Sequence, residues 1–130
     1  MPQEVPPTVL IVEPSETTRR ILEYTFSAEG FVPVGLSSVQ EALFALRSIV
    51  PDIAIVEAQL PDASGIAVVR ALQDDPSFRH VPVLMMSGTP EERALLQKSE
   101  GAFQAVFEKP FSLKKLVQTA RGLIGSRAAG

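Results

Sequence analysis

The sequence predicts a single α/β domain in which five parallel strands form one sheet with helices on both faces. The main observation is an alternation, repeated five times, of a short apolar run with a segment of helical spacing. A strand, a helix and a second strand in this order form a parallel pair through a right-handed crossover. The length of 130 residues also fits one domain, because a chain of this size buries roughly two-thirds of its unfolded surface.

Turn and cap residues mark the first two strands and the helix between them. Residues 8–12 (TVLIV) form a continuous apolar run, which is typical of a strand buried on both faces. The helical pattern of residues 15–29 begins at Ser15, a favoured N-cap residue. Residues 31–35 form a weaker second strand, which we expect at a sheet edge because Pro33 lacks the backbone N–H that a central strand needs.

The third unit opens with a helix signal. Ser38 and Glu41 have the spacing of a capping box, in which each side chain accepts a hydrogen bond from the other residue's backbone N–H. We expect this helix to continue until Pro51, which cannot extend it. Residues 53–56 then predict the third strand, and residues 66–72 return to helical spacing after a turn-rich segment.

The last two units follow the same pattern. Residues 81–86 predict the fourth strand, and Pro90 fits the first position of a helix over residues 91–98. Residues 103–107 predict the fifth strand. Ser112 then caps a final helix whose apolar stripe ends near residue 124.

The chain therefore divides into a proline-rich arm at residues 1–7, the domain at residues 8–124, and a C-terminal tail or truncated linker at residues 125–130. The N-terminus lacks the basic and apolar regions of a signal peptide, and no apolar stretch approaches the length of a membrane span. We expect a cytoplasmic protein that does not bind membranes.

Composition excludes several classes of function. There is no cysteine, which rules out disulfides and thiolate metal sites. The single histidine makes a histidine metal cluster or a Ser-His-Asp triad implausible. The net charge of −3 provides no basic field for direct nucleic-acid binding. No activated nucleophile or acid–base pair is visible, and we expect a protein that is not an enzyme.

Four polar residues follow strands of the predicted sheet. Glu13, Glu57, Ser87 and Lys109 come at or after the ends of the first, third, fourth and fifth strands. The carboxyl ends of parallel strands share one edge, which is where such folds place ligands. Carboxylates hold a hard divalent cation, and a lysine and a hydroxyl orient phosphoryl oxygens. The spacing alone is equally compatible with a plain ion pair of Lys109 with either glutamate.

Four segments around the strand ends are distinctive: LIVEPSETTRRIL, PDIAIVEAQLPDASG, VPVLMMSGTP and VFEKPFSLKKL. Through these segments the chain resembles the receiver domains of two-component response regulators, the CheY-like family, over about residues 8–124. The resemblance implies the flavodoxin-like strand order 2-1-3-4-5.

The family resemblance implies a role for each strand-end residue. In the family, an aspartate at the end of the third strand accepts a phosphoryl group from a histidine kinase; Glu57 stands at that position. Ser87 and Lys109 fit the positions that contact the phosphoryl oxygens. Glu13, Glu57 and the backbone carbonyl of Gln59 fit the Mg²⁺ shell. The resemblance also implies a cis peptide bond before Pro110.

Three departures from the family pattern put this chemistry in doubt. Glu57 is one methylene longer than aspartate, which misplaces an in-line transfer. Pro14 replaces the second acid after the first strand, which weakens or removes the Mg²⁺ site. Val106 stands where the family often has an aromatic switch residue. We therefore expect a pseudo-receiver that needs no cofactor and is not phosphorylated in the usual way.

The expected partner is a histidine kinase or a downstream effector, bound through the face of the fourth helix, fifth strand and fifth helix, which is also the family's usual homodimer surface. Two alternatives remain open: a phosphorylatable, Mg²⁺-dependent receiver, and a flavodoxin-like cofactor binder that uses the hydroxyls of residues 15–18. Glu57 either mimics a phosphorylated state or simply pairs with Lys109. Asp62 is expected to be a turn residue, and Arg19 to lie on a solvated or partner-binding face.

Overall fold

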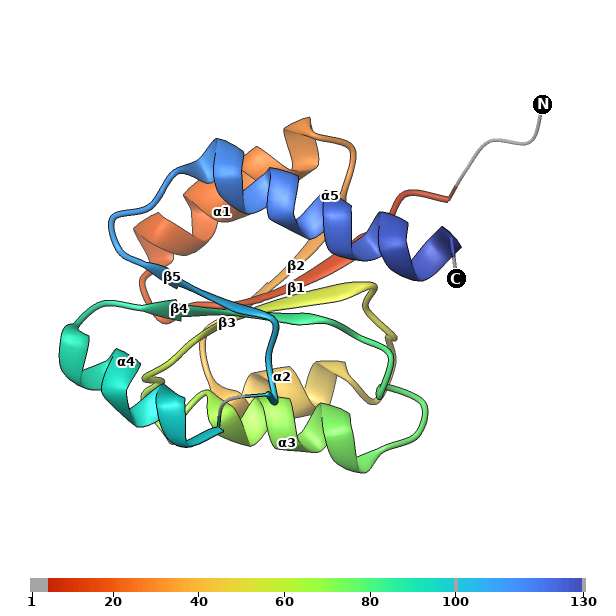
Figure 1. Cartoon of the computed structure of the whole chain (residues 1–130). Helices are drawn as coiled ribbons and strands as arrows, with labels where there is room; N and C mark the ends of the chain where they lie inside the picture. Colours follow the sequence, from red (N-terminus) through yellow and green to blue (C-terminus); the bar gives the residue numbers. More distant parts are fainter. Residues whose placement is uncertain (1–4, 100, 130) are drawn as a thin grey trace.

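The fold is a five-stranded parallel sheet between two layers of helices, in a computed structural model that describes residues 5–99 and 101–129 (Figure 1). The strand order is β2-β1-β3-β4-β5, and every neighbouring pair is parallel. The strands are β1 (Thr8–Val12), β2 (Val32–Leu36), β3 (Ile53–Glu57), β4 (Val83–Ser87) and β5 (Ala105–Glu108). The helices are α1 (Glu16–Ala28), α2 (Val39–Ala45), α3 (Ile66–Asp74), α4 (Pro90–Leu96), the short 3₁₀ helix η1 (Gln97–Ser99) and α5 (Leu113–Ala129). The predicted fold class is confirmed.

Figure 1 shows α1 and α5 on one face of the sheet and α2, α3 and α4 on the other. Each face has its own core, because alternate residues of a strand point to opposite sides. On the α1–α5 side Val9, Ile11 and Ile55 pack against Phe26 and Leu116. The core on the other side includes Leu10, Val12, Val56, Val68 and Met85. The central strands β1, β3 and β4 are consequently buried on both faces.

Local signals account for most helix starts. The Ser15 hydroxyl accepts a hydrogen bond from Thr18 N, and Ser112 accepts one from Lys115 N, so both predicted caps are present. Pro90 occupies the first turn of α4. Strand β2, which contains Pro33, lies at an edge of the sheet as predicted.

The predicted end of α2 is wrong. The helix ends at Ala45 rather than at Pro51, because the N–H groups of Arg47 and Ser48 bond three residues back and tighten the chain into a turn. The apolar spacing continues past this end since Leu46 and Ile49 in the turn still pack on the same core. Sequence periodicity therefore could not separate the helix from the turn that follows it.

The chain ends differ from the predicted division in one respect. Helix α5 continues through Gly125 to Ala129, so the segment expected as a tail or linker at residues 125–130 is helical over its described part. Of the predicted arm, residues 1–4 lie outside the described residues. In the part of the chain that the structure describes, no helix combines the length and the apolar character that a membrane crossing requires.

Candidate functional site

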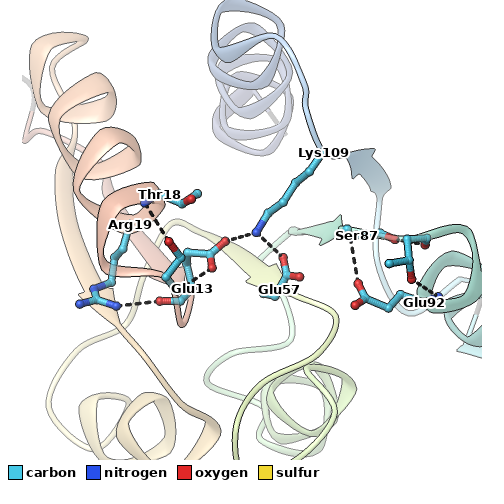
Figure 2. Close-up of polar contacts among 10 residues, drawn as sticks. Glu13, Thr18, Arg19, Glu57, Ser87, Glu92 and Lys109 are labelled. Atoms are coloured by element: carbon cyan, nitrogen blue, oxygen red, sulfur yellow. Dashed lines mark hydrogen bonds and ion pairs between the residues drawn. The ribbon is translucent and has the colours of Figure 1, made fainter.

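Three strand-end side chains, those of Glu13, Glu57 and Lys109, meet at the carboxyl edge of the sheet, and a fourth, that of Ser87, lies to one side of them (Figure 2). Glu57 and Ser87 are the last residues of β3 and β4, whereas Glu13 and Lys109 directly follow β1 and β5. Among the described residues, Glu13, Glu57 and Ser87 are the buried polar ones, with exposed fractions of 1%, 6% and 1%. The parallel register places these residues at one edge of the sheet, where Lys109 contacts Glu13 and Glu57.

Lys109 lies at the centre of this cluster. Its Nζ donates a short hydrogen bond to Glu13 Oε1 and lies 3.1 Å from Glu57 Oε2. Burial alone lowers the pKa of a lysine, but the bond to Glu13 and the charge of Glu57 outweigh it and raise the pKa of Lys109. The lysine therefore remains charged and is shared by two carboxylates from different strands.

Glu57 is the member of the cluster whose carboxylate has an oxygen without a hydrogen-bond partner in the described part of the chain. Burial raises the pKa of its carboxyl to about 7, despite the opposing pull of Lys109, and the charges of Glu13 and Glu92 add to the increase. Its Oε2 has no hydrogen-bond partner among the described residues, so its contact with Lys109 is an ion pair outside hydrogen-bond geometry. At neutral pH a substantial fraction of Glu57 is therefore protonated.

Glu13 is fixed at both its side chain and its backbone. Its Oε2 accepts a 2.9 Å hydrogen bond from Ser15 N, and its carbonyl oxygen accepts a 2.8 Å bond from Arg19 Nη1. Arg19 is less solvated than expected, because its guanidinium reaches back over the first turn of α1 and its side chain is only 20% exposed. The neighbouring Pro14 is exposed and brings no carboxylate to the site.

The loop between β4 and α4 is closed by its own side chains. Ser87 Oγ donates to Thr89 O at 2.9 Å, and Gly88 N donates to Glu92 Oε2 at 2.9 Å. The Thr89 hydroxyl in turn accepts from Glu92 N at 3.1 Å. Sequence reasoning missed Glu92, although Thr89 and Glu92 have the three-residue spacing of a capping box.

The loop between β3 and α3 connects the site to α2. Asp62 accepts hydrogen bonds from Val39 N and Gln40 N, which lower the pKa of its carboxyl. Asp62 is therefore more than a turn residue: it caps the first turn of a helix distant in sequence. Gln59 is exposed and forms an isolated antiparallel bridge with Ser64.

Two further residues singled out by the resemblance lie around β5. The peptide bond between Lys109 and Pro110 is cis. Val106 is half-buried and packs on the core beneath α2, α3 and α4. Its small side chain has no aromatic ring that could alternate between buried and exposed positions.

The donor set does not fit a magnesium site. The two carboxylates that the resemblance assigns to the cation both face the Lys109 ammonium, and residue 14 is a proline. No cluster of three or more His, Cys, Asp or Glu residues within the described ranges could hold a metal ion. A hard dication prefers several oxygen ligands with matching negative charge, and here the lysine already offsets part of the charge of the two carboxylates.

Comparisons with known proteins identify the family and the fold. The polar-differentiation response regulator DivK of Brucella anthropi is 28% identical over 121 residues, which are 93% of this chain and 98% of DivK. Two solved structures show the same fold. One is the chemotaxis response regulator CheY4 of Vibrio cholerae, with a TM-score of 0.81, 22% identity, and coverage of 92% of this chain and 99% of that one.

The other is the receiver domain of the sensor histidine kinase PA1611 from Pseudomonas aeruginosa, whose structure has a coordinated magnesium ion. Its TM-score is 0.83, with 17% identity and coverage of 93% of this chain and 99% of that one. The family model of the response regulator receiver domain matches residues 9–121. The chain therefore belongs to the response regulator receiver domain family of two-component signalling.

Proposed function

We propose that this receiver domain is a pseudo-receiver, an interaction module whose output does not depend on phosphoryl transfer to residue 57. Receiver domains interact with kinases and with effector domains. The observation that carries the proposal is the position of Lys109, whose ammonium lies between Glu13 and Glu57. In this arrangement the lysine neutralises the protein's own carboxylates, where a working receiver would need it for an incoming phosphoryl group.

The protonation of Glu57 supports the same proposal. A carboxyl group attacks phosphorus only in its ionised form, and burial raises the pKa of Glu57 to about 7. The extra methylene relative to aspartate also shifts the oxygens along the line of attack, and misplacement by about 1 Å costs on the order of a hundredfold in rate. A bound dication would stabilise the developing charge, but the two carboxylates that would hold it face the Lys109 ammonium instead.

The proposed docking surface is the edge formed by β5 with α4 and α5. Strand β5 has a neighbour on one side only, and α4 and α5 flank it on opposite faces of the sheet (Figure 1). Arg93 of α4 forms a 2.6 Å ion pair with Glu108 of β5, so the helix and the strand present one continuous surface.

The proposal is tested by amide NMR of the chain with Mg²⁺ and then with Mg²⁺ and beryllofluoride, a phosphoryl mimic. We expect no saturable shifts at Glu13, Glu57, Ser87 or Lys109 and none that extend into α4. A receiver domain that retains the acceptor aspartate, measured in the same buffer, shows that the reagent is active. Saturable shifts in this chain that centre on Glu57 and spread to α4 would contradict the proposal and support a phosphorylatable receiver.

A further inference from the structure

The loop between β4 and α4 binds a carboxylate of the same chain, that of Glu92. Gly88 N donates to the Glu92 carboxylate at 2.9 Å, and the Ser87 hydroxyl donates to Thr89 O at 2.9 Å. Figure 2 shows Glu92 reaching back from α4 to the end of β4. The hydroxyl and the first N–H after the strand are therefore both engaged inside the loop.

These donors lie next to Lys109. A cleft between the β4–α4 loop and the end of β5 is lined by Ser87, Gly88, Thr89, Pro90, Glu108 and Lys109. Glu92 lines the neighbouring cleft, between α4 and the β3–α3 loop. Its carboxylate thus binds the Gly88 N–H from the α4 side, next to the place where Ser87 and Lys109 come together.

We infer that Glu92 is a built-in competitor for anions at the end of β4, which keeps the Gly88 N–H away from a phosphoryl group. A charged hydrogen bond to a backbone N–H is stronger than a neutral one, and an added anion must displace it. The carboxylate is tethered three residues after its N-cap and so competes at a high effective concentration. Its negative charge also opposes the approach of a second anion.

This inference rests on the proposed pseudo-receiver function and adds a second barrier to phosphoryl binding, separate from Glu57 and Pro14. Restoring the two acids in the variant Glu57→Asp/Pro14→Asp should then recover beryllofluoride binding only in part. Removing Glu92 as well should recover more of it. A residue that merely caps α4 would have the opposite effect or none, because loosening the loop does not strengthen an anion site.

The test compares the beryllofluoride affinity of three chains by amide NMR in saturating Mg²⁺. They are the two-acid variant alone, the same variant with Glu92→Ala, and the same variant with Glu91→Ala. Glu91 lies on the same turn and is exposed, so its removal changes the charge equally without releasing Gly88. We expect Glu92→Ala to tighten binding about tenfold or more and Glu91→Ala to change it less than about twofold. Equal affinities in the three chains, or no binding in any of them, would overturn the inference.

A second measurement uses the chain without the restored acids. The Gly88 amide proton should follow the ionisation of a carboxyl group during a pH titration, and this step should disappear in Glu92→Ala but persist in Glu91→Ala. A Gly88 amide that titrates identically in all three proteins would overturn the inference. Beryllofluoride binding by the unsubstituted chain would contradict the pseudo-receiver proposal itself, so the two failures are distinguishable.

Discussion

Lys109 links β1, β3 and β5 through a single ammonium group. Its two carboxylate partners are buried, with exposed side-chain fractions of 1% for Glu13 and 7% for Glu57, whereas the lysine side chain is 27% exposed. A buried ion pair contributes little net stability, but removal of one partner leaves an uncompensated buried charge. The cluster is therefore more sensitive to loss of the lysine than its partial exposure suggests.

We predict that Lys109→Met lowers the free energy of unfolding by about 2–4 kcal/mol at pH 7.5, because two buried carboxyl groups then face each other without a cation. Methionine keeps the apolar stem, so the loss reports the charge. Urea denaturation measures it. Lys115→Met is the matched control, since Lys115 is exposed on α5 and its removal should cost less than about 0.5 kcal/mol. Equal losses in the two variants would show that the cluster does not depend on the ammonium.

At the same scale, the sequence predicted which side chains meet but not how they are held. Glu13, Glu57, Ser87 and Lys109 could be predicted because strand ends in a parallel sheet share one edge. Arg19 and Asp62 could not, since their partners are backbone groups of a strand end and a helix start elsewhere in the chain. A bond to a backbone atom requires no particular residue type at the other end, so outside a local cap, such as the Thr89–Glu92 spacing, it leaves no pairing signal in the sequence.

At the scale of elements, Gly65 decides how closely α3 approaches β3. A Cβ at this position would lie 2.0 Å from the backbone oxygen of Glu57 and 3.0 Å from Val56 Cγ1. Gly65 N also donates to Ala58 O at 2.8 Å, which fastens the start of α3 to the end of the strand. The φ of Gly65 is −59°, which any residue can adopt. Glycine is therefore required at this position by the close approach and not by its backbone conformation.

We predict opposite effects for two glycine substitutions. Gly65→Ala should lower the free energy of unfolding by about 2 kcal/mol or more and displace the backbone at Glu57, because the added methyl group meets rigid backbone. Gly122→Ala should raise it by about 0.5–1 kcal/mol, since nothing lies within 4 Å of the added Cβ and alanine favours the helix. Urea denaturation with amide NMR of Glu57 measures both effects. A neutral Gly65→Ala would mean that α3 can move away at no cost.

At the scale of the whole molecule, the fold was predictable because the local helix and strand signals and the overall apolar pattern indicate the same architecture. Continuous apolar runs at β1 and β3 require burial on both faces, which only helices on both sides provide. The strand order followed from the family resemblance rather than from the pattern, since five alternating units fit several parallel arrangements. The end of α2 was missed because Leu46 and Ile49 keep the helical spacing in a turn.

The stability of the whole domain should also depend on pH through Glu57. Its pKa of about 7 in the folded chain lies above the ordinary value of 4.5, so between these values the folded state holds more protons than the unfolded state. The free energy of unfolding must then fall as the pH rises from about 5 to about 7.5. The total decrease is up to about 3 kcal/mol, because each pKa unit corresponds to about 1.4 kcal/mol.

The other groups with shifted pKa values titrate outside this pH interval. The pKa values of Asp62 and Glu41 are lowered, so their contributions are lost only in stronger acid, and that of Lys109 is raised from 10.5. We therefore expect urea denaturation of Glu57→Gln to show a nearly flat profile between pH 5 and 7.5, while Glu16→Gln, a change on the exposed first turn of α1, keeps the slope. A slope that persists in Glu57→Gln would assign the titration to another group. A profile that rises with pH would mean that the Lys109 ion pair outweighs burial and holds Glu57 ionised.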